Sequence, residues 1–171
     1  MNIEIYNFFV YFIIYAFIGW ILESIFDNEG FALIKKDCGF FYGPIRPIYG
    51  FGAMLIILVF SNFSDNIYLI FFGSVFLISF LEYFVGAIIE KYFNKKLWSY
   101  EDKKINFKGR ICLEYSLIWG LLSIFLIKFF HPCLEYLVKF PNTKIVYTFI
   151  LIFFVYFVFD SYFVFKKGKM L

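Results

Sequence analysis

The sequence lacks the motifs by which many soluble enzymes are identified. It contains no Walker A glycine–lysine loop, no His-x-x-x-His pair, no Gly-x-Ser-x-Gly nucleophile elbow and no Cys-x-x-Cys element. The only histidine, His131, precedes Pro132, and we expect it to end a helix at the outer membrane face. These absences favour a non-enzymatic chain with no catalytic residue and no cofactor. Any ATPase that drove transport would have to be another chain.

Cysteine and charge are also sparse. Cys38, Cys112 and Cys133 show no paired spacing, which argues against a disulfide framework or a zinc site. Charged residues make up 17% of the chain, and the net charge of +3 comes from basic residues gathered in loops. Membrane topology explains this concentration of basic residues in loops without a nucleic-acid ligand, so we expect no nucleic-acid partner. The N-terminal apolar run lacks a basic segment before it and a small-residue cleavage site after it, which indicates a retained first span.

Apolar residues are abundant. Hydrophobic residues make up 63% of the 171 positions, whereas about 45–50% is usual for a soluble domain. A bilayer accepts this apolar surface without penalty, and water does not. The composition therefore predicts an integral membrane protein in the lipid bilayer, formed as a single transmembrane domain over residues 1–171.

Five stretches are long and apolar enough to cross the hydrocarbon core as helices, which takes about 20 residues each. They cover residues 5–26, 45–63, 66–90, 111–130 and 144–165. The turn between the second and third is short, so these two helices are expected to form an antiparallel hairpin. The predicted fold is an all-α bundle of about five transmembrane helices.

The basic residues predict the orientation of this bundle. All but three of the 16 Lys and Arg residues fall on one side of the predicted topology, and the exceptions are Lys128, Lys139 and Lys144. The side rich in Lys and Arg is cytoplasmic in most membrane proteins. We therefore expect the N-terminus outside the cell membrane and the C-terminus in the cytoplasm.

Acidic residues inside the predicted spans are the strongest functional signal. A charge in such a position costs from about 3 to above 10 kcal/mol, so it persists when it is paired, hydrated or used. The acids concerned are Glu23, Glu82, Glu114 and Asp160. At a rise of 1.5 Å per residue they lie about 5 to 12 Å from the inner ends of their spans. Arg46 and Arg110 enter the same layer, and together these groups predict a hydrated polar chamber that opens to the cytoplasm.

Small residues share a helical face with two of these acids. In the first and third spans the spacing i, i+3, i+7 aligns Ala16, Gly19 and Glu23, and likewise Ser79, Glu82 and Gly86. Small residues let helix backbones approach closely, so both faces are expected to be buried with the acid directed inward. The alternative role for these acids is a structural ion pair, for example between Glu23 and Arg46.

The other two acids have local explanations. Glu114 follows Arg110 at the i, i+4 spacing of a helical ion pair. Asp160 stands a few residues before Lys166 and Lys167, so its side chain could extend to the lipid headgroups.

Residues 39–52 form the densest local motif, GFFYGPIRPIYGFG. Pro44 and Pro47 suit the first turn of a helix, and the glycines allow unusual backbone dihedrals. Free amides at this helix start, next to Arg46, would suit an anion or the carboxylate of a zwitterion. The alternative is a packing device that fits the helix entry against the bundle. The candidate ligand-binding residues are Glu23, Gly43, Pro44, Arg46, Pro47, Tyr49, Glu82, Arg110, Glu114 and Asp160.

The connection over residues 91–110 mixes lysines with Trp98, Tyr100 and Phe107. Aromatic rings at headgroup level and lysines over anionic lipid explain this composition, and docking of a partner protein is the alternative. Its sequence is too varied for a flexible linker, so we expect a fixed structure.

Four of these motifs resemble the ABC-transporter type IV permease family, the CmpB-like multi-pass membrane proteins. The motifs are GWILE at residues 19–23, GFFYGPIRPIYGFG at 39–52, LEY at 81–83 and GRICLEYSLIWG at 109–120. The resemblance covers about residues 8–135 and implies a multi-pass bacterial membrane protein with the label of a permease. The chain carries WSYE at residues 98–101 where the family usually has Trp-Asp-Tyr-Ser, so no role of that Asp carries over.

Three functions are compatible with these observations. The first is a transport permease that binds a small polar or zwitterionic solute, working as a homodimer or with a separate ATPase subunit. The second is a membrane-embedded enzyme that acts on a lipid or lipid-linked substrate through an acid pair. The third is a non-catalytic scaffold whose ion pairs hold helices together.

Overall fold

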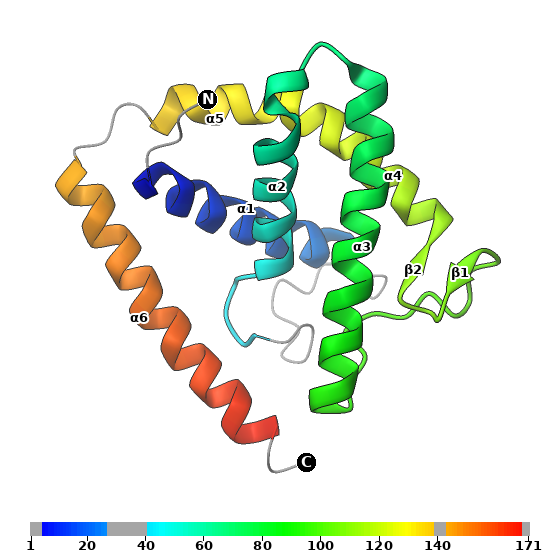
Figure 1. Cartoon of the computed structure of the whole chain (residues 1–171). Helices are drawn as coiled ribbons and strands as arrows, with labels where there is room; N and C mark the ends of the chain where they lie inside the picture. The colour runs from blue at the N-terminus through cyan, green and yellow to red at the C-terminus, as the bar shows by residue number, and fades with distance from the viewer. Residues whose placement is uncertain (1–4, 27–40, 139–142, 169–171) are drawn as a thin grey trace. The chain divides into compact units, whose positions relative to one another are not determined.

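The computed structural model describes residues 5–26, 41–138 and 143–168, and these residues are almost entirely helical (Figure 1). The helices are α1 (Ile5–Phe26), α2 (Pro47–Phe60), the 3-10 turn η1 (Ser61–Phe63), α3 (Ile67–Phe93), α4 (Leu113–Phe125), the π-helical turn η2 (Leu126–Phe130), α5 (His131–Val138) and α6 (Thr143–Gly168). Two short strands, β1 (Asn106–Phe107) and β2 (Ile111–Cys112), form an antiparallel pair. The predicted all-α class is confirmed. Lys35, Lys36, Cys38, Gly39, Phe40, Lys139 and Lys169 lie outside the described residues.

Among the described residues, four helices are long and apolar enough to span a membrane. They are Tyr6–Ile25, Ile67–Phe93, Leu113–Val138 and Lys144–Lys166. The second predicted span is shorter, an apolar helical stretch over Pro47–Phe63. It begins at Pro47 because residues 43–46 are held in a non-helical turn, in which the Ile45 amide donates to the Gly43 carbonyl at 2.8 Å. Pro47 suits the first helical position because its missing N–H would have no helical partner there.

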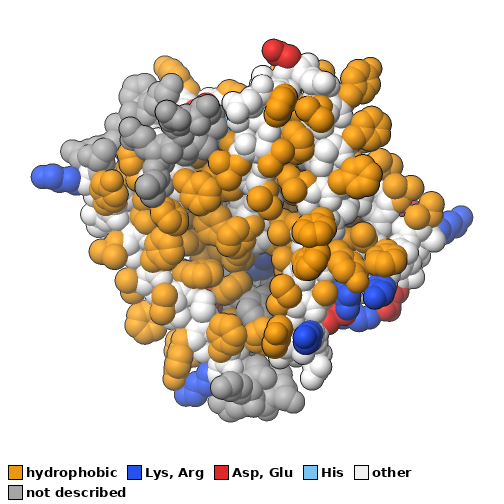
Figure 2. Space-filling model, in the orientation of Figure 1, with side chains coloured by type: hydrophobic (Ala, Val, Ile, Leu, Met, Phe, Trp, Pro, Cys, Tyr) orange, Lys and Arg blue, Asp and Glu red, His pale blue; other side chains and the backbone are white. Residues whose placement is uncertain are grey.

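Hydrophobic side chains cover much of the surface of these helices (Figure 2). Leu151 and Phe159 of α6, for example, are 65% and 61% exposed. A soluble protein would bury such residues, whereas in a membrane they contact acyl chains. The described residues therefore form a multi-pass membrane protein.

The chain divides into two compact units. Unit 1 covers Gly52–Lys139, and unit 2 combines Asn2–Phe51 with Phe140–Leu171. In unit 1, α3 and α4 pack closely, because a Cβ on Gly120 would lie 2.8 Å from Phe71 and Val75. In unit 2, α1 and α6 meet through aromatic rings, with the centroids of Phe9 and Phe154 5.4 Å apart.

The fourth predicted span continues past residue 130. Helix α4 passes through η2 into α5, and the His131 amide donates to the Leu126 carbonyl five residues earlier. Pro132 has no N–H for the helical ladder, and the wide π-helical turn just before it accommodates that missing bond. The prediction that His131 ends a helix is therefore wrong, and its side chain is 97% buried, being 3% exposed.

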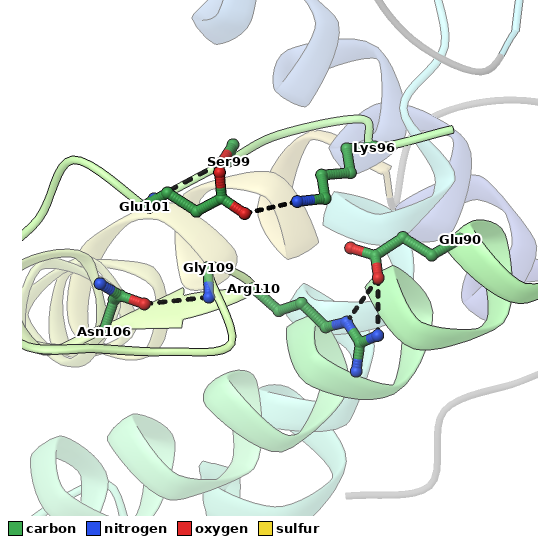
Figure 3. A network of polar contacts seen from close by, with 7 residues as sticks. All are labelled: Glu90, Lys96, Ser99, Glu101, Asn106, Gly109 and Arg110. Carbon is green, nitrogen blue, oxygen red and sulfur yellow. Dashed lines mark hydrogen bonds and ion pairs between the residues drawn. The ribbon is translucent and has the colours of Figure 1, made fainter. Parts of the chain in front are cut away.

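The connection between α3 and α4 has a fixed structure, as the sequence predicts. Trp98 Nε1 donates to the Arg110 carbonyl at 2.8 Å, and the Tyr100 amide donates to the Gly109 carbonyl at 2.8 Å. Asn106 Oδ1 accepts from the Gly109 amide at 3.0 Å (Figure 3). Gly109 has φ +65°, a left-handed conformation that glycine adopts without strain. These bonds hold Tyr100 and Arg110 in fixed positions beside α3 and α4.

Candidate functional site

The ten candidate residues fall into two groups, one in each unit. Unit 2 holds Glu23, Gly43, Pro44, Arg46, Pro47, Tyr49 and Asp160, which we name the Arg46 cluster. Unit 1 holds Glu82, Arg110 and Glu114, which we name the Glu82 cluster. The single chamber shared by all ten stays a prediction.

Arg46 is the centre of the first cluster. Its side chain is buried, its Nε donates to Glu23 Oε2, and its Nη1 donates to the Ile45 carbonyl at 3.1 Å. Its backbone amide donates to the Ala16 carbonyl at 2.9 Å. The ion pair between Glu23 and Arg46 that the sequence suggested is present. It ties the entry to α2 onto α1 and gives a charge in the spanning region a partner.

The inward face of α1 is buried against the start of α2. Ala16 is fully buried, and Gly19 faces the Tyr49 ring so closely that a Cβ would overlap it. The predicted burial of this face is confirmed at Ala16 and Gly19, whereas the Glu23 side chain at its end is 39% exposed. Tyr49 therefore has a packing role in this structure.

Asp160 binds the irregular segment before α2. Its Oδ1 accepts from the Tyr42 amide at 3.2 Å, and its Oδ2 accepts from the Gly43 amide at 3.1 Å. Successive backbone amides form a concave site for an anion, and here the chain supplies the anion itself. The prediction that Asp160 extends to the headgroups is wrong, because its side chain is buried on these amides. The same bonds occupy two of the amides that were expected to be free.

Gly43 explains why this segment can approach α6. A Cβ at this position would overlap the hydroxyl of Tyr156, which lies one turn before Asp160. Pro44 is exposed and Pro47 begins α2. These contacts support the packing alternative for the Pro/Gly motif.

Glu82 is the centre of the second cluster. Its side chain is 94% buried, being 6% exposed, within α3. Its Oε1 accepts from Trp119 Nε1 at 3.0 Å and from the Tyr100 hydroxyl at 3.5 Å. Among the residues that the structure describes, no group donates to Oε2, which is enclosed. A buried carboxylate is therefore bound on one oxygen only.

The predicted inward face of α3 is confirmed. The hydroxyls of Ser79 and Ser116 are 2.7 Å apart, and a Cβ on Gly86 would lie 3.5 Å from the Arg110 side chain. Ser79, Glu82 and Gly86 thus all face α4 or the connection before it. Sequence reasoning placed Tyr100 among the aromatic rings at headgroup level and assigned no role to Trp119, so it missed both as donors to Glu82.

Arg110 and Glu114 do not pair with each other. Arg110 binds Glu90 through Nε at 3.0 Å and Nη2 at 2.6 Å, as Figure 3 shows, and Lys103 binds Glu114 at 3.1 Å. The predicted i, i+4 pair is wrong because Arg110 precedes α4, which begins at Leu113, and helical spacing does not apply there.

Both of these ion pairs raise the pKa of the basic residue in the pair. The Glu90 carboxylate, by accepting hydrogen bonds, raises the pKa of Arg110, and Glu114 raises the pKa of Lys103 in the same way. Both basic groups are therefore charged and engaged near neutral pH. Within the described ranges, no group of three or more His, Cys, Asp and Glu side chains is arranged to hold a metal ion.

A protein-family model described as Putative ABC-transporter type IV matches residues 10–165. The chain belongs to that family. The match confirms the resemblance seen in the motifs and extends it through α6, which carries Asp160. No curated protein and no solved structure matches the chain. The family and the four apolar helices together describe a multi-pass membrane protein of ABC-transporter type.

Proposed function

We propose that this protein is a membrane permease subunit that binds a small polar or zwitterionic solute in a polar chamber facing the cytoplasm. The observation that supports it most is the burial of Arg46, Glu82 and Asp160 inside or beside apolar spanning helices. Ionisable groups in such positions are costly, and they commonly mark solute or proton pathways. In this proposal the N-terminus lies outside and the C-terminus in the cytoplasm.

The two clusters would have different roles. Glu82 would hold a cationic group or a proton, because one of its oxygens is without a donor among the described residues. Arg46 and the backbone of residues 43–52 would hold the anionic group of the solute. Since Glu23 and Asp160 occupy these donors in this structure, the solute anion would have to displace a carboxylate of the protein itself.

A partner is part of the proposal. The part of the chain that the structure describes has four long spanning helices and one shorter apolar helix, which is little for a complete transport pathway. The sequence contains no nucleotide-binding loop, and the family is of ABC-transporter type. We therefore propose that the subunit works with a second copy or with a separate ATPase subunit, which copurification from native membranes would reveal.

Uptake and binding in membrane vesicles test the proposal. A panel of polar and zwitterionic solutes is measured with the wild type, Glu82→Gln and Arg46→Gln. Both variants are expected to lose uptake, whereas Asp65→Asn, a change at an exposed turn residue, is the control that keeps it. Wild-type uptake by both variants would remove the proposal.

A scaffold function is the second candidate, and the pairing in the Arg46 cluster favours it. Each of the two acids in that cluster binds a donor from another segment, as a purely structural site would. Loss of folding on neutralising Glu23, with no transported solute found for the folded protein, would support the scaffold.

A further inference from the structure

Glu82 and Asp160 are both buried acids, yet the hydrogen bonds that they accept are distributed differently over their two oxygens. Each oxygen of Asp160 accepts one backbone amide. Both donors to Glu82 bind the same oxygen, Oε1, and no described residue forms a hydrogen bond with Oε2. An ionised carboxylate offers acceptor sites on both oxygens, whereas a protonated one accepts mainly through its carbonyl oxygen. The pattern at Glu82 fits the protonated form, with Oε1 as the carbonyl oxygen, better than the ionised form, although the O–H on Oε2 would have no acceptor among the described residues.

No cation is placed to balance a charge on Glu82 among the residues described. The groups that face it are Trp119 from α4 and Tyr100 from the connection, and both are neutral donors. The nearby charged side chains are engaged in pairs, Arg110 with Glu90 and Lys103 with Glu114. Residues 52–60 of α2, which contact α3 at Ile78, contain no titratable side chain. An ionised Glu82 would therefore be a buried charge with one firm hydrogen bond, which is unfavourable.

The free oxygen is also closed to anything larger than a proton. Oε2 has essentially no contact with solvent, so neither water nor the ammonium group of a solute reaches it in this structure. A proton needs no cavity. This geometry separates the two roles that the proposed function leaves open for Glu82.

We propose that Glu82 is a proton-binding site, that it carries a proton on Oε2 in this structure, and that it releases the proton during transport. Uptake adds one proton from water to the carboxylate and changes its charge from −1 to 0, and release reverses that step with no other atom transferred. The role of the proton in transport rests on the proposed permease function, whereas the protonated site does not.

Tyr100 joins Glu82 to the connection outside the spanning helices through the other carboxyl oxygen, Oε1. Its hydroxyl lies 3.5 Å from Glu82 Oε1, and the residue sits in the partly exposed connection, outside the spanning helices. The hydrogen bond from its amide to the Gly109 carbonyl holds its backbone. Its ring stacks on Tyr115 with centroids 4.9 Å apart.

Infrared spectroscopy of the purified full-length protein in lipid vesicles tests the site without a solute. At neutral pH the wild type is expected to show the carbonyl stretch of a protonated carboxyl group, and Glu82→Gln is expected to lose it. The matched control Glu114→Gln removes an exposed carboxylate and is expected to keep the band. Absence of the band in the wild type, or its persistence in Glu82→Gln, would overturn the proposal.

A second variant keeps the test decisive if Glu82→Gln does not fold. Trp119→Phe removes the firm donor to Oε1 and leaves the carboxyl group in place, so it should shift the band to higher frequency without abolishing it. A band that does not move in Trp119→Phe belongs to another residue and refutes the assignment. If the band behaves as expected but no solute is transported, the proposed permease function fails while the protonated site stands.

Discussion

The two units place acids inside apolar helices in different ways. In unit 2, Glu23 binds Arg46 and Asp160 binds two backbone amides, so each acid joins segments that are distant in the sequence. In unit 1, Glu82 is bound through one oxygen by two neutral donors. A structural role accounts for an acid in a spanning helix whose charge is paired or whose oxygens accept hydrogen bonds. An acid with an oxygen that accepts no hydrogen bond requires a further explanation. The comparison therefore indicates that the Arg46 cluster holds segments together, whether or not it also binds solute as proposed, and it supports the proposed proton site at Glu82.

Removal of Arg46 should have the largest effect on stability. Arg46→Leu leaves the Glu23 carboxylate without its partner, and we expect a loss of about 2–4 kcal/mol, because a charge in a spanning region is left unpaired. Thermal unfolding in detergent micelles measures it. The double variant Arg46→Leu/Glu23→Leu should recover most of the loss. If the single variant were as stable as the wild type, the Arg46 cluster would have no role in assembly.

Gly43→Ala should have the next largest effect. The new Cβ would overlap the Tyr156 hydroxyl, and the forced shift should cost about 1–3 kcal/mol. Because the nearest atom is that hydroxyl oxygen, Tyr156→Phe in the Gly43→Ala background should restore part of the loss. Gly52→Ala is the matched control, since its Cβ would lie at an ordinary 3.4 Å from Ile78. Equal losses for both glycines would show that close packing on α6 is not the cause.

Asp160→Asn should cost about 1–2 kcal/mol. The amide side chain keeps one acceptor oxygen but brings an N–H group against a backbone N–H, so one of two buried bonds is lost. The measurement is the unfolding midpoint in micelles, together with hydrogen exchange at the Tyr42 and Gly43 amides, which should become faster. Unchanged exchange at both amides would contradict the bonds to Asp160.

Glu82→Gln sharpens the comparison because it should change stability by less than about 1 kcal/mol. Glutamine has nearly the shape of a neutral carboxylic acid, and its oxygen can accept from Trp119 as Oε1 does. The same unfolding experiment therefore separates Asp160→Asn from Glu82→Gln. A loss for Glu82→Gln as large as that for Asp160→Asn would mean that Glu82 is a structural anion too.

The pair between Lys103 and Glu114 should have the smallest effect, since it is largely exposed. Glu114 raises the pKa of Lys103, so the contribution of the pair is fully present below the ordinary Lys pKa of about 10.4. It is lost as the pH rises through the raised value in the folded protein. Lys103→Gln should therefore unfold like the wild type at still higher pH, where that lysine is neutral. A difference that persisted there would have another origin.

Much of the packing could be predicted because helical periodicity is local information. The helical spacing correctly identified faces that the structure buries at Ala16 and Gly19 of α1 and at Glu82 of α3. The start of α2 was placed within two residues, since Pro47 favours a first helical position. Apolar length alone identified the four long spans, but it overestimated the stretch at residues 45–63, whose helix over Pro47–Phe63 is shorter than a full span.

The wrong predictions for Arg110 and Asp160 share one physical cause, which is a partner that lies far away in the sequence. The predicted pair of Arg110 and Glu114 assumed that Arg110 lies in the helix, but the helix begins only at Leu113. The predicted contact of Asp160 with the headgroups assumed that no distant donor was available. The bonds of Asp160 join residues 117 or 118 positions apart, and no spacing rule reports such a contact. The donors to Glu82 likewise come from an irregular connection and another helix. Partners of this kind require the tertiary structure.

The most direct measurement is the infrared carboxyl spectrum of the full-length protein in vesicles, recorded in parallel for Glu82→Gln, Glu23→Gln and Asp160→Asn. We expect the band of a protonated carboxyl group to disappear in Glu82→Gln and to remain in the two variants of the Arg46 cluster. Loss of the band in Glu23→Gln or Asp160→Asn, with Glu82→Gln unchanged, would contradict the division of these three acids into structural and chemically active ones.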